Sequence, residues 1–253
     1  KTKKICKSKN KKNILFRRDR NNAFQTIKNT NKKMIIVAID EIDINKVTAI
    51  IENLDPKKCM IKIGSVSFNC MGHKIINYVA EKGFDIFLDL KLHDIPNTVK
   101  KSIEGLATLP ILMLTIHISG GKNMMLAAME AVSNSKIKVF GVTALTSLSD
   151  ADTNKIYQRT ANEHVNAMLD IAEESKLDGV VCSPHELDLV TARGSLLSIT
   201  PGIRISDSND DQARVMSPKK AISLGANYLV IGRPITGAQD ISEALNSIYQ
   251  SIN

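Results

Sequence analysis

Several patterns that mark common protein classes are missing from this 253-residue sequence. Its four cysteines, Cys6, Cys59, Cys70 and Cys182, form no CxxC pair and match no zinc-binding spacing, so we expect reduced, mostly buried thiols in a cytoplasmic protein. No uninterrupted run of about 18 apolar residues occurs, which predicts that nothing spans a membrane. The N-terminus also lacks the continuous apolar stretch of a secretory signal.

The net charge of +8 is confined to one end of the chain. Residues 1–33 carry thirteen basic side chains and one acidic one, whereas the remaining 220 residues carry 21 basic and 25 acidic. The composition of residues 1–33 is compatible with a targeting peptide or a nucleic-acid-binding arm. However, its Lys/Asn-rich start cannot form a hydrophobic core, and the first expected strand begins directly after it, at Met34. We therefore predict a disordered or non-native extension over 1–33 and no affinity of the domain at 34–253 for nucleic acid.

Short apolar runs alternate with helical patterns from Met34 onward. The expected strands are 34–40, 59–64, 84–92, 110–119, 138–145, 178–183, 196–203 and 227–232. The expected helices are 44–54, 68–83, 97–108, 121–134, about 161–175, 185–193, 217–224 and 240–252. Continuous apolar strands are typical of parallel sheets, and eight such units favour an α/β fold of the closed (β/α)8 type, the TIM barrel. A doubly wound sheet is the alternative, but no GxGxxG turn follows the first strand.

Polar side chains gather at the carboxyl ends of these strands, where the active sites of such barrels lie. They are Asp40, Lys62, Asp89, Lys91, His93, Asp94, His117, Thr146, Ser147, Ser183, Arg204 and Arg233. Because charges at the ends of strands one, two, three, seven and eight converge on one mouth, the sequence predicts an active site there.

The most informative segment is Asp-Leu-Lys-Leu-His-Asp at 89–94. Asp89 and Lys91 are two apart on a strand, so both face the barrel interior, and Lys62 on the neighbouring strand reaches the same point. A lysine inside an apolar strand is costly without a purpose. Such an array of acids and ammonium groups suits a reaction in which a negative charge leaves and a proton is delivered. The alternative is an ion-pair network that only stabilises the barrel mouth.

The other side of the mouth has the features of a phosphate site. The seventh strand ends in Pro-Gly-Ile-Arg (201–204) and the eighth in Ile-Gly-Arg-Pro (231–234). Gly202 and Gly232 let the backbone approach an anion, and Arg204 or Arg233 can bind it in a bidentate manner. The polar loop from Arg204 to Met216 is expected to be either a lid that carries Gln212 or a solvated surface loop.

A set of segments together resembles the orotidine 5'-monophosphate decarboxylase family of the short bacterial type. They are AID (38–40), MIKIG (60–64), FLDLKLHDIPNTV (87–99), HISGG (117–121), LTS (145–147), TPGIR (200–204) and DDQARVMSPKKAISLGANYLVIGRPIT (210–236). The resemblance runs from Met34 to the C-terminus, and the first 33 residues have no counterpart in it. It implies decarboxylation of orotidine 5'-monophosphate to uridine 5'-monophosphate in de novo pyrimidine synthesis, with no cofactor and no metal.

The resemblance also implies individual roles. Lys91 would be the proton donor to C6 of the pyrimidine, and Asp89 would face the substrate carboxylate. Asp40 and Lys62 would hold the ribose hydroxyls, with Lys62 also pairing with Asp89. Asp94 would act in the site of the neighbouring subunit, because the family forms homodimers with shared sites.

The remaining expected contacts are with the nucleotide. Ligand contacts would come from the segment Ile95, Pro96, Asn97 and Thr98, and from Thr146. Gln212, Gly232 and Arg233 would bind the phosphate, with Arg204 nearby. His93 and His117 are expected to be supporting residues.

Two rival functions are weighed against this one. Keto-sugar-phosphate decarboxylases and hexulose-phosphate synthases also resemble an Asp-x-Lys-x-x-Asp barrel, but they use magnesium, and Pro96-Asn97-Thr98 and the Asp211-Gln212 loop argue against them. The second rival is a protein that binds nucleic acid through residues 1–33 and whose barrel has no catalytic activity. The intact set of charges at the barrel mouth argues against idleness.

Overall fold

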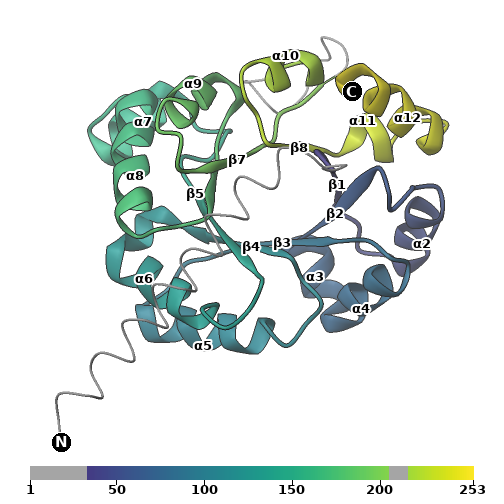
Figure 1. The fold of residues 1–253 in the computed structure, drawn as a ribbon, viewed down its shortest axis with the longest axis horizontal. Coiled ribbons are helices and arrows are strands. Elements are labelled where there is room, and N and C mark those ends of the chain that lie inside the picture. The colour runs from purple at the N-terminus through teal and green to yellow at the C-terminus, as the bar shows by residue number, and fades with distance from the viewer. Residues whose placement is uncertain (1–32, 205–215) are drawn as a thin grey trace, which may run out of the picture. The chain divides into compact units, whose positions relative to one another are not determined.

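The computed structural model describes residues 33–204 and 216–253, and its strands close into a parallel barrel in chain order (Figure 1). The strands are β1 (Ile35–Ile39), β2 (Cys59–Gly64), β3 (Ile86–Leu92), β4 (Met113–His117), β5 (Lys138–Val142), β6 (Gly179–Val181), β7 (Leu197–Thr200) and β8 (Tyr228–Ile231). Pairing of β8 with β1 closes the barrel. The predicted (β/α)8 barrel is confirmed, and the doubly wound alternative is wrong. The extension predicted over 1–33 lies outside the described residues, apart from Lys33.

Helices cover the outside of the barrel (Figure 1). They are α2 (Ile44–Glu52), α3 (Ser65–Met71), α4 (His73–Glu81), α5 (Pro96–Leu106), α6 (Gly121–Ala131), α7 (Asp150–Tyr157), α8 (Ala161–Glu174), α9 (Leu187–Thr191), α10 (Pro218–Ser223), α11 (Arg233–Thr236) and α12 (Ile241–Ile252). Within the described part of the chain, no helix is long and apolar enough to cross a bilayer.

The helical regions differ from the prediction at three places, one of which is the short helix α11, absent from the expected helices. The single helix expected over 68–83 is two helices, because Gly72 between α3 and α4 has φ +58, a left-handed conformation that glycine adopts without strain. Helix α7 was not predicted. It begins with a capping box, in which Ser149 and Asp152 satisfy each other's backbone N–H groups.

The core has two layers separated by the strands. Along β1, Ile35, Val37 and Ile39 pack outward in the cluster shared with the helices, while Ile36 and Ala38 point into the barrel. The interior cluster consists of Ile36, Ala38, Met60, Phe87, Met113, Phe140, Leu197, Ile199, Tyr228 and Val230. These side chains fill the barrel, so the space left for a ligand lies above them at the carboxyl ends of the strands.

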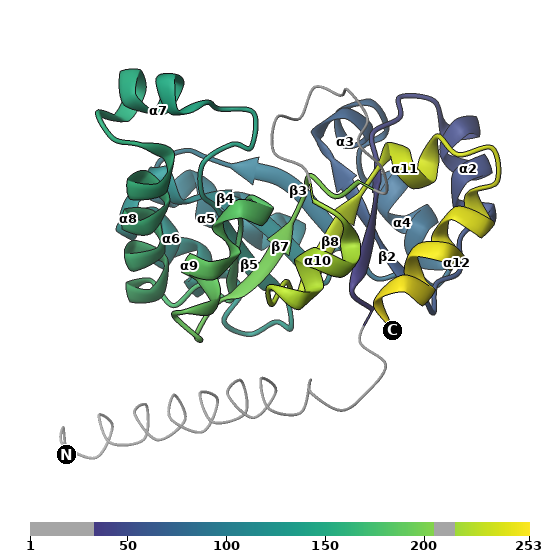
Figure 2. The same ribbon diagram turned by 90° about the horizontal axis from the view of Figure 1, so that it is seen from above.

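The pairing of β3 with β4 is irregular where the predicted charges lie. Leu88 is opposite Leu114, but Leu92 is opposite Ile116, so residues 89–91 face the single residue Thr115. Lys91 in this bulge has φ +52. The bulge lies at the carboxyl end of β3, which is the end of the barrel at which α3, α7 and α11 also lie (Figure 2).

Candidate active site

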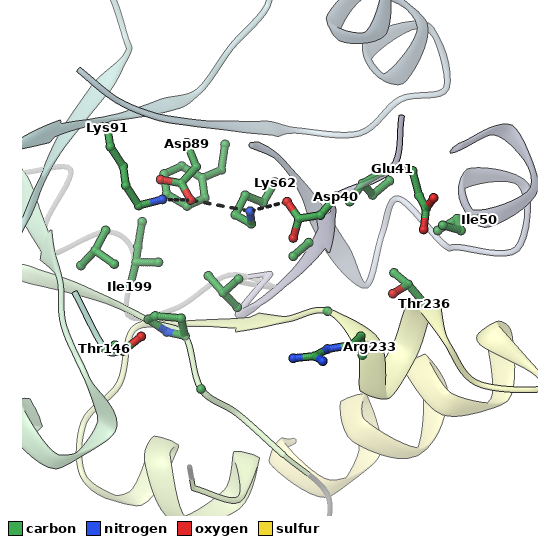
Figure 3. A pocket seen from close by; sticks show the side chains of 18 of the residues that line it. Asp40, Glu41, Ile50, Lys62, Asp89, Lys91, Thr146, Ile199, Arg233 and Thr236 are labelled. Carbon is green, nitrogen blue, oxygen red and sulfur yellow. Dashed lines mark hydrogen bonds and ion pairs between the residues drawn. The ribbon is translucent and has the colours of Figure 1, made fainter. Parts of the chain in front are cut away.

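A pocket of about 570 Å³ opens at the carboxyl ends of the strands (Figure 3). Its apolar lining includes Ala38, Phe87, Val181, Ile199 and Val230, which also contact or belong to the cluster inside the barrel. Its charged lining consists of Asp40, Glu41, Lys62, Asp89, Lys91, Arg204 and Arg233. Four cations against three anions make the pocket suited to an anionic ligand.

Four of these charges form an alternating row along one wall (Figure 3). Lys62 Nζ lies 3.0 Å from Asp40 Oδ1 and 3.6 Å from Asp89 Oδ2. Lys91 Nζ lies 2.8 Å from the same Asp89 Oδ2. The structure therefore brings the four side chains into one continuous chain of ion pairs.

Burial increases from the ends of the row to its middle. The side chains of Lys62 and Asp89 are 11% and 10% exposed, against 35% for Lys91 and 54% for Asp40. Burial alone would raise the pKa of Asp89, but the ammonium groups of Lys62 and Lys91 outweigh it and hold that pKa below its ordinary value. Asp89 is therefore an anion at neutral pH.

His93 and His117 lie beside the row, with ring centroids 5.3 Å apart. Burial lowers the pKa of His117 by disfavouring the charged form, and the charges of His93 and Lys91 lower it further. The uncharged form of the His117 imidazole is therefore favoured at neutral pH.

Two residues that the sequence reasoning missed support Asp40. The buried Ser67, on α3, accepts a hydrogen bond from the Glu41 N–H (3.1 Å), and its hydroxyl lies 2.7 Å from the Glu41 carbonyl oxygen. This contact fixes the chain directly after Asp40. A Cβ atom at Gly64 would lie 2.9 Å from both Asp40 Oδ1 and Lys62 Nζ, so glycine leaves the space that their ion pair occupies.

Thr115 on β4 was also missed. Its side chain is fully buried, and its Oγ1 donates to Asp89 Oδ1 (3.0 Å) and accepts from the Lys91 N–H (2.9 Å). A threonine within an apolar strand carries no sequence signal for such a contact.

The opposite wall comes from the ends of β7 and β8. Arg233 is the first residue of α11, directly after Gly232, and its side chain lies across the pocket from the row (Figure 3). Arg204 is buried, with Nη1 donating to the Ile203 carbonyl (3.0 Å). The backbone N–H of Arg204 donates to the Met216 carbonyl (3.0 Å). This bond joins the residues on either side of the segment 205–215.

The predicted site residues fall into three groups. Those lining this pocket are Asp40, Lys62, Asp89, Lys91, Thr146, Arg204, Gly232 and Arg233. Those exposed to solvent beside it, after β3, are Asp94, Ile95, Pro96, Asn97 and Thr98. The third group is Gln212 alone, which lies outside the described residues. Gly202, which was expected to let the backbone approach an anion, also lines the pocket, whereas Glu41, Ile50 and Thr236 line it but were not predicted.

Acidic, histidine and cysteine side chains are the usual protein ligands of a metal ion. Among residues 33–204 and 216–253, no three such side chains are grouped as a metal site requires.

Known proteins resemble the chain over nearly all of the barrel. A model of the orotidine 5'-phosphate decarboxylase / HUMPS family matches residues 33–248. An orotidine 5'-phosphate decarboxylase of Ehrlichia canis is 45% identical over 222 residues, which are 87% of this chain and 97% of that protein. One from Saccharophagus degradans is 43% identical, covering 85% and 92%. The crystal structure of an orotidine 5'-phosphate decarboxylase from Lactobacillus acidophilus superposes with a TM-score of 0.78 at 34% identity, covering 88% of this chain and all of that one. The chain belongs to the orotidine 5'-phosphate decarboxylase / HUMPS family.

Proposed function

We propose that this protein decarboxylates orotidine 5'-monophosphate to uridine 5'-monophosphate, a step of pyrimidine biosynthesis. The observation that carries the proposal is the row Lys91–Asp89–Lys62–Asp40 facing Arg233 across one pocket, in a chain whose relatives bear the name of this enzyme. The substrate has a carboxylate on its pyrimidine ring and a phosphate at the other end of its ribose. The two walls match these two anionic ends.

The walls divide the work of binding. Arg233 and the Gly232 backbone hold the phosphate, with Arg204 and Gln212 completing that side. Asp40 and Lys62 hold the ribose hydroxyls, since a carboxylate accepts and an ammonium donates hydrogen bonds. The pyrimidine then lies over the apolar floor, with C6 toward Lys91.

The chemical step uses the middle of the row. Asp89, held as an anion, lies next to the substrate carboxylate, and the repulsion favours loss of CO2, although preorganised charge supplies the larger effect. The bond from C6 to the carboxyl carbon breaks, and its electron pair stays on C6. The Lys91 ammonium stabilises this carbanion and transfers a proton from Nζ to C6. Lys91 then regains a proton from water, and no cofactor or metal takes part.

A direct assay tests this function. We expect orotidylate absorbance to fall on addition of the protein, at the same rate in excess EDTA, because the reacting charges are all side chains. The control is the same protein to which magnesium has been added back. Failure to consume orotidylate would refute the proposal, and activity on a keto-sugar phosphate that EDTA abolishes and magnesium restores would favour the HUMPS side of the family.

We also propose a cytoplasmic homodimer in which Asp94 acts in the site of the partner. Asp94 and the residues up to Thr98 are exposed and do not line the pocket of their own chain. Exposed apolar side chains follow each of the first three strands, namely Ile42 (68%) after β1, Val66 (45%) on α3 after β2, and Ile95 (67%) after β3. Apolar groups gathered at one end of a barrel favour a protein partner there.

Mixing of two inactive variants tests the shared site. Lys91→Ala and Asp94→Ala proteins should each be inactive, and their mixture should recover activity because a mixed dimer has one intact site. Complete exchange of equal amounts should restore about a quarter of the wild-type activity. Subunit exchange is verified by mass spectrometry of differently labelled protomers. If exchanged mixtures stayed inactive, Asp94 would not act across the interface.

A further inference from the structure

Thr115 occupies the position on which the geometry of the row depends. It is the one residue of β4 opposite the three bulged residues 89–91 of β3. In a regular ladder, backbone groups of β4 would pair with this stretch of β3. At the bulge the Thr115 hydroxyl takes that place for the Lys91 N–H, at 2.9 Å.

The same hydroxyl also sets the orientation of the Asp89 carboxylate. A hydroxyl has one proton to donate and lone pairs to accept, and Thr115 uses both capacities here, donating to Asp89 Oδ1 at 3.0 Å. Because Oδ1 is engaged in this way, Oδ2 is the oxygen that meets Lys91 Nζ at 2.8 Å and Lys62 Nζ at 3.6 Å. One side chain therefore fixes both the acid and the backbone of the lysine beside it.

The backbone of Lys91 needs such support. Its φ of +52 is a left-handed conformation that strains a non-glycine residue, so it persists only where the surroundings hold it. Leaving its N–H without the Thr115 oxygen at this partly buried position would add part of the cost of an unsatisfied donor. The side chain of Lys91 would then lose the direction that its backbone gives it.

We propose that Thr115 is a positioning residue that holds Asp89 and Lys91 in the arrangement required for proton delivery. The inference rests on the proposed decarboxylase function and goes beyond it, because Thr115 does not line the pocket. Its contribution passes through Asp89 and Lys91 alone.

The kinetic test compares valine and serine at this position. Thr115→Val keeps the branched shape but removes both hydrogen bonds, and we expect kcat to fall by about 100-fold, the effect of a small misplacement of reacting groups. KM for orotidylate and Kd for uridylate should change by less than about 3-fold, since the phosphate and ribose contacts remain. Thr115→Ser restores the hydroxyl and should keep kcat within about 5-fold of the wild type.

A matched control separates this role from the loss of any buried hydroxyl. Thr153 on α7 is also fully buried, and its hydroxyl bonds to the Ser149 and Asp150 carbonyls, away from the pocket. Thr153→Val should lower the melting temperature without changing kcat. Equal kcat in Thr115→Val and the wild type, or equal losses in the serine and valine variants, would overturn the proposal.

A second measurement does not depend on activity. The pKa of Asp89 is followed by ¹³C NMR of its carboxyl carbon, assigned by comparison with Asp89→Asn. Loss of the Thr115 hydrogen bond should raise the pKa of Asp89 in the valine variant and not in the serine variant. If the wild type failed to decarboxylate orotidylate, the proposed function would be refuted. The titration would still show whether the Thr115 hydroxyl lowers the pKa of Asp89. An unchanged pKa in Thr115→Val would refute the positioning role.

Discussion

Lys91→Ala is expected to abolish decarboxylation and to leave uridylate bound with little loss of affinity. Loss of a general acid alone costs up to about 10⁴-fold, and the same ammonium also stabilises the carbanion, so kcat should fall further than that. Binding survives because the phosphate and ribose contacts of Arg233, Asp40 and Lys62 do not involve Lys91. Asp89 also keeps its ion pair with Lys62.

Single-turnover kinetics with orotidylate and calorimetric titration with uridylate measure the two effects separately. Lys100→Ala is the matched control, because Lys100 makes an ion pair of the same 2.8 Å length and has a similar side-chain exposure of 32%, but lies outside the pocket. It should retain wild-type kcat. Substantial turnover by Lys91→Ala would show that another group delivers the proton.

Arg233→Ala should weaken binding of the phosphorylated substrate far more than it slows the reaction of bound substrate. Loss of a charge-assisted hydrogen bond to the phosphate costs about 1.5–3 kcal/mol, so KM should rise by about 10-fold or more. The fall in kcat should be smaller and should reflect only the part of the phosphate binding energy that is used to orient the ring. Steady-state kinetics with orotidylate measure both constants.

The nucleoside orotidine provides the decisive comparison, because it has no phosphate to lose. Its slow turnover should be nearly the same in Arg233→Ala and in the wild type. Arg193→Ala is the control for loss of an arginine, since Arg193 pairs with Asp170 at 2.6 Å and does not line the pocket. If Arg233→Ala harmed orotidine and orotidylate equally, Arg233 would be a structural residue and the phosphate site would be wrongly placed.

The barrel was predictable because its strands are continuous apolar runs, each buried on both faces. The division between α3 and α4 was not, since the apolar periodicity of a helix continues across Gly72 and only its backbone conformation interrupts it. Helix propensity can be estimated from the sequence of each segment. The left-handed conformation of one particular glycine, such as φ +58 at Gly72, cannot.

Part of the candidate site was predictable for a similar reason. The spacing of Asp89 and Lys91 and the cost of a lysine within an apolar strand indicated the row before any coordinates. The bulge and the bonds of Thr115 depend on the register of β3 against β4, which is a property of two strands together. The proposed role of Asp94 places its environment in a second chain, which neither one sequence nor one protomer contains.

The floor of the pocket is formed by side chains that also belong to the hydrophobic cluster inside the barrel. Ala38, Phe87, Ile199 and Val230 seal the barrel from the inside and at the same time form the surface on which a ring would lie. Reshaping that surface for a larger or smaller ring therefore requires repacking of the barrel, and each such change is paid in stability. Evolution of new specificity on this scaffold is freer at the rim than on the floor, since Thr146 lies in a turn and Thr236 ends the short helix α11. The same coupling leaves the base of the pocket less room for substitution than its mouth.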